Sequence, residues 1–142
     1  PKMGEWINGA IDADLKEKGA FDMTAPYRDG TRLVQAEGGT YLRPTIVHCD
    51  SMNHPLSNRE FLCPYASVVE VPQSQMLGAI GPTLVVTAIT KDESFKQKLL
   101  SASNIERLNL GPISTMKISW DQPHEGNMFE FLYKRRSIGM AA

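Results

Sequence analysis

The alternation of strand-like and helix-like segments between residues 65 and 114 constrains the fold more than any other feature of the chain. Three stretches are short and rich in β-branched or apolar residues, as strands are: "YASVVEV" (65–71), "TLVVTAIT" (83–90) and "ERLNLGPIS" (106–114). The second is almost wholly apolar or β-branched, which is typical of a strand covered on both faces.

Two helical patterns separate these strands. The first follows Pro72, which suits a first helical turn, and its apolar face holds Met76, Leu77 and Ile80. The second spans 93–103, is capped by Asp92, and has an apolar stripe made of Phe95, Leu99, Leu100 and Ala102. Strand, helix, strand, helix, strand with short links predicts an α/β fold with a mostly parallel sheet and right-handed crossover helices.

The first fifty residues are less regular. An amphipathic helix is predicted over 6–15, ending near Gly19, with an apolar face made of Trp6, Ile7, Ala10, Ile11 and Leu15. Turn-forming residues in 22–40 indicate a surface excursion or an edge hairpin, with the glycines of "EGGT" in a turn. The stretch 41–50 resembles a strand. The part that contains Pro44 is confined to a sheet edge or an irregular segment, because proline has no N–H to donate to the ladder.

The size of the chain predicts one folding unit. The chain has 142 residues, 42% of them hydrophobic and 22% charged, so we expect a single domain, or a fragment of one, over residues 1–142. Fifteen Lys and Arg against sixteen Asp and Glu give a formal charge of -1. Nucleic-acid binding needs a basic excess, so we expect no nucleic-acid partner.

Targeting features are also absent from the sequence. No apolar run approaches the ~20 residues that a membrane-spanning helix needs, and the charged helical opening lacks the apolar region of a secretory signal. Two cysteines without such a signal indicate free thiols. We therefore expect a cytoplasmic protein that does not bind a membrane.

The apolar stretch "NMFEFLY" (127–133), followed by the basic triplet "KRR", offers two interpretations. It could pack on another subunit and make a homo-oligomer, or it could form a satellite of the chain's own core. The sequence leaves both open.

Cys63 and Glu60 lie three residues apart and invite a catalytic interpretation. A nucleophilic thiol needs a nearby base or positive charge, whereas a carboxylate raises the thiol pKa. Glu60 is therefore a poor activator, and a half-buried structural Cys63 ahead of Pro64 is the expected case. We assign no catalytic residue to this chain.

A metal site is not expected either. Four ligand types occur within seven residues, namely His48, Cys49, Asp50 and His54, but neighbours on a strand point to opposite faces and no CxxC or HExxH pattern completes a set. His124 is a lone loop histidine, and "EGGT" lacks the spacing of a phosphate-binding loop.

The most specific pattern spans residues 38–71. It holds a glycine, an aromatic residue and "PT" with an apolar pair, here Gly39, Tyr41, Pro44, Thr45, Ile46 and Val47. An acidic residue then leads into a strand through Glu60, Phe61, Leu62, Cys63 and Pro64. This order and spacing resemble the late catalytic-domain segment of the aldehyde dehydrogenase superfamily, whose corresponding pattern is close to E-x-F-G-P.

The resemblance implies a cofactor role for two residues. Glu60 looks like the family glutamate that accepts hydrogen bonds from the ribose hydroxyls next to the nicotinamide of NAD or NADP, and Leu62 stands where an aromatic residue commonly packs on that ring. A carboxylate suits this task because it accepts from two hydroxyls at once. Cys63 stands where the family usually has glycine.

Other parts of the family pattern do not occur in this sequence. The resemblance implies that the nucleophilic cysteine, the general-base glutamate and the nucleotide-binding fold come earlier in a complete enzyme. The family asparagine after the last strand would fall near Met116, and only Pro123 and Gly126 agree with its C-terminal glycine-rich motif. We therefore expect the C-terminal portion of an NAD(P)-dependent aldehyde dehydrogenase, needing its N-terminal segment or a partner chain and binding no cofactor alone.

Two alternatives belong to other classes. One is a non-catalytic interaction or oligomerisation module on the same scaffold, which the apolar tail favours. The other is a small α/β hydrolase or tautomerase using Cys63, His124 or Pro1. The aldehyde substrate and the choice between NAD and NADP lie beyond the sequence.

Overall fold

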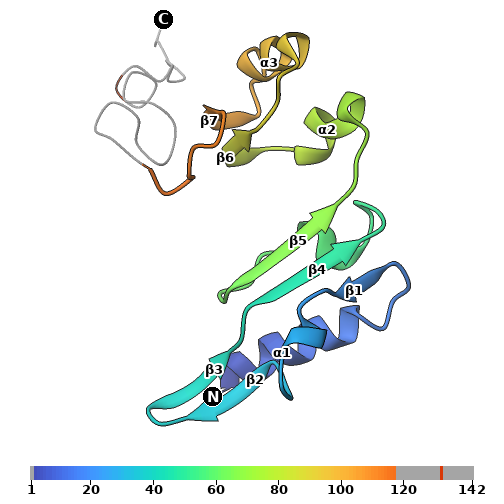
Figure 1. Cartoon of the computed structure of the whole chain (residues 1–142), viewed down its shortest axis with the longest axis vertical. Coiled ribbons are helices and arrows are strands. Elements are labelled where there is room, and N and C mark those ends of the chain that lie inside the picture. Colours follow the sequence, from blue (N-terminus) through green and yellow to red (C-terminus); the bar gives the residue numbers. More distant parts are fainter. Residues whose placement is uncertain (1, 118–131, 133–142) are drawn as a thin grey trace, which may run out of the picture. The chain divides into compact units, whose positions relative to one another are not determined.

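The computed structural model describes residues 2–117 and Leu132, and divides into two compact units, Pro1–Pro72 and Gln73–Ala142 (Figure 1). Each unit has its own parallel strand pair, so the predicted α/β class with parallel strands is confirmed. The apolar tail 127–133 lies, apart from Leu132, outside the described residues, as do Pro1, Pro123, His124 and Gly126.

The first unit begins with helix α1, Lys2–Asp14, which starts four residues before the predicted span 6–15 and ends one residue before it. Ile7 and Ile11 are its buried residues. Trp6, predicted on the apolar face, is instead 60% exposed. The two isoleucines are four residues apart and share one stripe, which is narrower than the sequence pattern indicated.

A three-stranded sheet forms the centre of this unit, with the order β1-β4-β5 (Figure 1). The strands are β1 (Ala20–Asp22), β4 (Thr45–Cys49) and β5 (Tyr65–Val69). β1 runs antiparallel to β4, and β5 runs parallel to β4 with Thr45 opposite Tyr65. Val47, Cys49 and Leu56 are the buried centre of the core beneath this sheet.

The predicted edge hairpin occurs as β2 (Leu33–Ala36) and β3 (Gly39–Leu42), joined through a turn in which Gly38 has φ 91°. Pro44 separates β3 from β4, so the stretch 41–50 is two strands and not one. The cause is proline's missing N–H, which ends the hairpin ladder and lets β4 enter a different sheet. Two short 3-10 helices, η1 (Ala25–Tyr27) and η2 (Pro55–Asn58), complete the unit.

The second unit contains α2 (Gln73–Ile80), β6 (Thr83–Ala88), α3 (Glu93–Leu100) and β7 (Ile105–Leu110). β6 and β7 pair in parallel across the α3 crossover, as the alternation predicts. The predicted cap is confirmed, because the Asp92 carboxylate accepts a hydrogen bond of 3.1 Å from Phe95 N.

Two details of this unit differ from expectation. Among the described residues β6 has one strand neighbour, β7, and Leu84 is 51% exposed, so β6 is not covered on both faces. α3 ends at Leu100, three residues before the predicted end, and Leu100 is exposed while Phe95 and Leu99 are buried.

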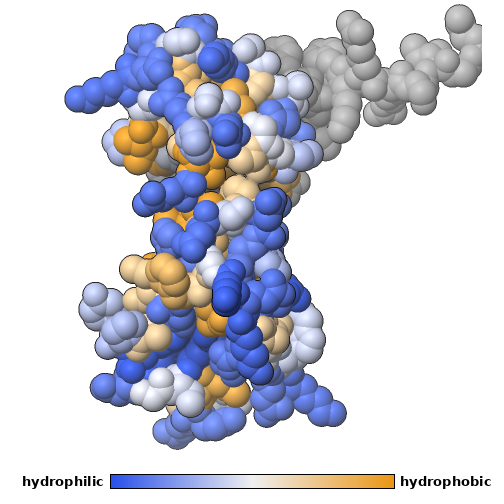
Figure 2. All heavy atoms as spheres, turned by 90° about the vertical axis from the view of Figure 1, so that its right-hand side faces the viewer, coloured by the Kyte–Doolittle hydropathy of each residue, from blue (hydrophilic) through white to orange (hydrophobic). Residues whose placement is uncertain are grey.

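Hydrophobic side chains also reach the surface. Figure 2 shows hydrophobic residues (orange) exposed between hydrophilic ones (blue) on the face it presents. The exposed large residues of the first unit include Phe21, Ile46, Leu62 and Val68. Within the described residues, no helix has both the length and the apolarity needed to cross a membrane.

Candidate functional site

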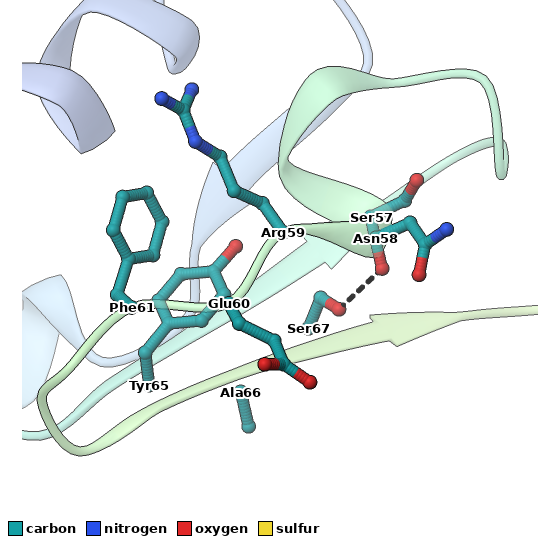
Figure 3. Close-up of a pocket in the computed structure, with 8 residues that line it drawn as sticks. All are labelled: Ser57, Asn58, Arg59, Glu60, Phe61, Tyr65, Ala66 and Ser67. Atoms are coloured by element: carbon teal, nitrogen blue, oxygen red, sulfur yellow. Dashed lines mark hydrogen bonds between the residues drawn. The ribbon is translucent and has the colours of Figure 1, made fainter. Parts of the chain in front are cut away.

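Glu60 lies in an open pocket of about 420 Å³ on the first unit, where the chain passes from η2 into β5 (Figure 3). The pocket is lined by Ser57, Asn58, Arg59, Glu60, Phe61, Tyr65, Ala66 and Ser67. Most of these side chains are polar, so the pocket suits a hydrogen-bonding ligand better than an apolar one.

Local sequence builds the wall of this pocket. His54 caps η2 by accepting a 3.1 Å hydrogen bond from Leu56 N, and Pro55 occupies the first turn. The Ser57 hydroxyl lies 2.7 Å from the carbonyl oxygens of both Met52 and His54, which share its single proton. These contacts fix the turn from which residues 57–60 leave toward β5.

A second set of contacts ties β5 to the same turn. The Ser67 hydroxyl donates to the Ser57 carbonyl at 2.7 Å, the bond drawn in Figure 3. The Tyr65 hydroxyl donates to the Leu56 carbonyl, also at 2.7 Å. Burial, with smaller contributions from neighbouring charges, raises the pKa of Tyr65 to about 12, so this phenol stays protonated and keeps donating.

The Glu60 carboxylate points away from Arg59 and Phe61 and lies on the side of Ala66 (Figure 3). It makes no hydrogen bond to the other residues drawn there. The side chain is exposed, so both carboxylate oxygens are accessible to a ligand. A carboxylate in this state can accept from two donors at once.

Leu62 is on the same loop but does not line the pocket. Cys63 N donates to Phe61 O at 2.8 Å, which closes a three-residue turn with Leu62 at its centre. This turn explains why the Leu62 side chain is 89% exposed. The cofactor roles of Glu60 and Leu62 stay predictions.

The two thiols lie in environments that disfavour the thiolate. Burial raises the pKa of Cys63, and the Arg32 charge offsets this only in part. Burial and the neighbouring Asp50 charge raise the pKa of Cys49, which is fully buried. Neither cysteine has the electropositive, accessible surroundings of a nucleophile.

The four clustered ligand types have separate surroundings. The His48 ring stacks on Phe21 with centroids 5.1 Å apart, and its Nδ1 lies 3.6 Å from Asp50. His54 uses its Nδ1 in the η2 cap. In residues 2–117, no group of three or more His, Cys, Asp or Glu side chains is arranged to hold a metal ion. Met116, near which the resemblance predicted the family asparagine to fall, is 78% exposed.

Sequence reasoning missed the contributions of Ser57, Arg59 and Tyr65 to the pocket. Tyr65 was visible only as the first residue of a strand, and Arg59 only as a charged neighbour of Glu60. The sequence offers one indication only, which is position along the chain. Arg59 is the neighbour of Glu60, and Tyr65 begins the strand that follows the same loop, so both were candidates to lie near Glu60.

A cluster of ion pairs lies elsewhere in the first unit, with the side chains of Arg28, Arg32 and Asp22 largely buried and that of Asp12 half exposed. Arg32 donates to Thr45 Oγ1 at 3.0 Å, to Asp12 at 2.8 Å and to Asp22 at 3.0 Å. Arg28 also donates to Asp22 and, at 3.0 Å, to Thr45 Oγ1. These contacts join α1, β1 and β4, so the cluster has the character of a structural brace, although the buried Arg28 Nε has no hydrogen-bond partner among the described residues.

The solved structures that share this fold include two dehydrogenases. One is an indole-3-acetaldehyde dehydrogenase in complex with NAD+, with a TM-score of 0.67 and 17% identity over 89% of this chain. The other is the delta-pyrroline-5-carboxylate dehydrogenase from Mycobacterium tuberculosis, with a TM-score of 0.62 and 18% identity over 89% of this chain. This chain spans 25% and 23% of the lengths of those proteins. No family model and no curated protein sequence matches it.

Proposed function

We propose that this chain is the C-terminal portion of the catalytic domain of an NAD(P)-dependent aldehyde dehydrogenase, which oxidises an aldehyde to an acid or acyl product. The observation that carries the proposal is the structural match of 89% of this chain to a quarter of a dehydrogenase solved with NAD+. The order of the motif residues in 39–64 supports the same family independently of the fold.

In this proposal Glu60 binds the cofactor. The bound nicotinamide cofactor supplies the hydride acceptor, and the protein's task at this wall is to hold the ribose in place. The Glu60 carboxylate is exposed, lies in an open polar pocket and makes no hydrogen bond to the other lining residues, so its surroundings fit a ligand with two vicinal hydroxyls. Leu62, at the tip of its turn, would add apolar contact.

The isolated chain is inactive under this proposal, because thiol addition to an aldehyde requires a nucleophile and a base together with the cofactor. Cys49 and Cys63 both have raised thiol pKa values. The nucleophile, base and nucleotide fold would come from a preceding segment of the same polypeptide or from a partner chain.

The first test uses the chain itself and its gene. Calorimetric titration of the chain with NAD and with NADP should give no measurable binding. A submicromolar affinity would contradict the proposal that the nucleotide-binding fold lies outside this chain. The reading frame upstream should encode a cysteine-bearing, nucleotide-binding segment. A start codon directly ahead of Pro1 would contradict the proposal that this chain is the C-terminal portion of a longer dehydrogenase.

The second test uses the complete polypeptide. Glu60→Gln should raise the KM for the cofactor at least about 10-fold, since a charge-assisted hydrogen bond is worth about 1.5–3 kcal/mol. Glu70→Gln is the matched control, because Glu70 is an exposed glutamate of the same unit that does not line the pocket.

A second candidate function is a non-catalytic interaction or oligomerisation module. Its support is the exposure of large apolar side chains such as Leu62, Val68 and Ile89. Sedimentation velocity across a concentration series distinguishes the two: a stable homo-oligomer of the isolated chain, with no upstream dehydrogenase segment in the gene, favours the module.

A further inference from the structure

Arg59 makes two contacts on the side of the loop opposite to the Glu60 carboxylate. Its Nη1 forms an ion pair with Asp14 Oδ2, and its guanidinium carbon lies 5.1 Å from the centre of the Phe61 ring. Figure 3 shows Arg59 and Phe61 on one side and the Glu60 carboxylate on the other. Stacking on an aromatic face and pairing with a carboxylate both restrict a guanidinium to one orientation.

Phe61 is held in turn by the start of β5. Its ring meets the Tyr65 ring edge to face, with centroids 4.9 Å apart. The Tyr65 hydroxyl is fixed by its 2.7 Å hydrogen bond to Leu56 O. Phe61 is therefore connected to η2 through Tyr65.

Asp14 anchors the other end. It is the last residue of α1, where the helix dipole disfavours a carboxylate. Arg59 supplies the compensating positive charge, and the Asp14 side chain is 18% exposed, so water screens the pair only partly. The ion pair joins α1 to a loop 45 residues further along the chain.

The backbone converts these contacts into an orientation for Glu60. Arg59 is extended, with φ -115° and ψ 134°, and successive side chains of an extended segment point to opposite sides. Holding residues 59 and 61 on one side therefore leaves Glu60 on the other, toward the pocket. We propose that Asp14, Arg59 and Phe61 are positioning residues that aim the Glu60 carboxylate at the cofactor ribose, an inference that rests on the proposed function.

The test compares variants of the complete dehydrogenase polypeptide. Arg59→Ala and Asp14→Asn should each raise the KM for NAD or NADP about 10-fold while changing kcat little, because they misplace a binding group and leave the reacting groups intact. Arg59→Lys should recover part of the loss, since lysine keeps the charge but lacks the planar stacking group. Arg43→Ala is the matched control, with its guanidinium on the Asp29 carbonyl, outside this pocket.

A second measurement uses the 142-residue chain. Asp14→Asn should speed amide hydrogen exchange in residues 59–63 while leaving exchange in β4 unchanged. Unchanged exchange in residues 59–63 would overturn the positioning role, because the ion pair would then not order this loop. Faster exchange throughout the first unit would also overturn it, because the ion pair would then stabilise the whole unit and not this loop in particular.

The two hypotheses fail in different ways. If Glu60→Gln raises the cofactor KM but Arg59→Ala and Asp14→Asn do not, the positioning role is overturned and the proposed function stands. If Glu60→Gln itself leaves the cofactor KM unchanged, the ribose contact fails, and the positioning role fails with it.

Discussion

Asp22 is shared by two arginines, because Arg32 Nη2 lies 3.0 Å from Asp22 Oδ2 and Arg28 donates to the same oxygen. The side chains of Asp22 and Arg32 are 8% and 5% exposed. Removing one partner of a buried pair leaves the other charge without compensation in a low-dielectric site. The cluster joins β1 and α1 to β4, so its loss should be felt throughout the first unit.

Asp22→Asn should therefore lower the free energy of unfolding by about 3 kcal/mol, the lower end of the range for breaking a buried pair. Urea denaturation followed by circular dichroism measures this. Asp29→Asn, at an exposed aspartate, is the control and should change the stability by less than about 0.5 kcal/mol. A loss below that value for Asp22→Asn would show that the cluster is not a structural brace.

The same aspartate predicts a pH dependence. Burial alone would raise the Asp22 pKa, but hydrogen bonds from Thr24, Arg32 and Arg28 outweigh it and hold the pKa below the ordinary value of 3.8. A carboxyl group with a lowered folded-state pKa stabilises the fold above its unfolded pKa, and this stabilisation is lost as the pH falls through the folded value. The stability difference between the wild type and Asp22→Asn should thus be constant near pH 7 and shrink below about pH 4. Denaturation curves at pH 7, 5, 4 and 3 check the trend, and a difference that grows on acidification would contradict it.

The cap of α3 gives a local prediction. Asp92 accepts from Phe95 N, and Gln73 donates to its other oxygen at 2.6 Å. Asp92→Ala should leave the first turn of α3 without its cap, so the Phe95 amide should exchange faster with solvent, whereas Asp92→Ser should keep most of the protection. Hydrogen exchange of the Phe95 amide is measured in both variants. Equal protection of this amide in Asp92→Ala and Asp92→Ser would show that the Asp92 cap does not determine where α3 begins.

Sequence patterns predicted the positions of helices and strands better than they predicted which strands pair. The cap at Asp92, the hairpin around "EGGT" and the strands 65–71 and 83–90 follow from local chemistry, and each is found at or near its predicted place. Strand pairing does not follow from local chemistry, because a β-branched segment suits any ladder. Nothing in residues 65–71 marks β4 as the partner that β5 has in the structure.

The candidate site shows the same limit. Glu60 was found through a family resemblance, and no periodicity marks it. The extended backbone at Arg59 explains why Glu60 and Arg59 face opposite ways, but the Asp14 partner is 45 residues distant and no local pattern predicts it. The exposure of Leu62 depends on a three-residue turn whose closing hydrogen bond leaves no compositional trace.

The cysteines provide the last prediction. Burial raises the pKa of Cys63 above its ordinary value of 9.0, so the thiolate is scarce at neutral pH. Iodoacetamide should therefore modify Cys63 slowly at pH 6 to 8 and faster above about pH 9. Cys49, which is fully buried, should react only when the chain unfolds in denaturant. Mass spectrometry of timed reactions, with Cys63→Ser as the control that isolates Cys49, measures both rates. Rapid modification of Cys63 near pH 6 would show an activated thiol, and would make Cys63 itself a candidate nucleophile.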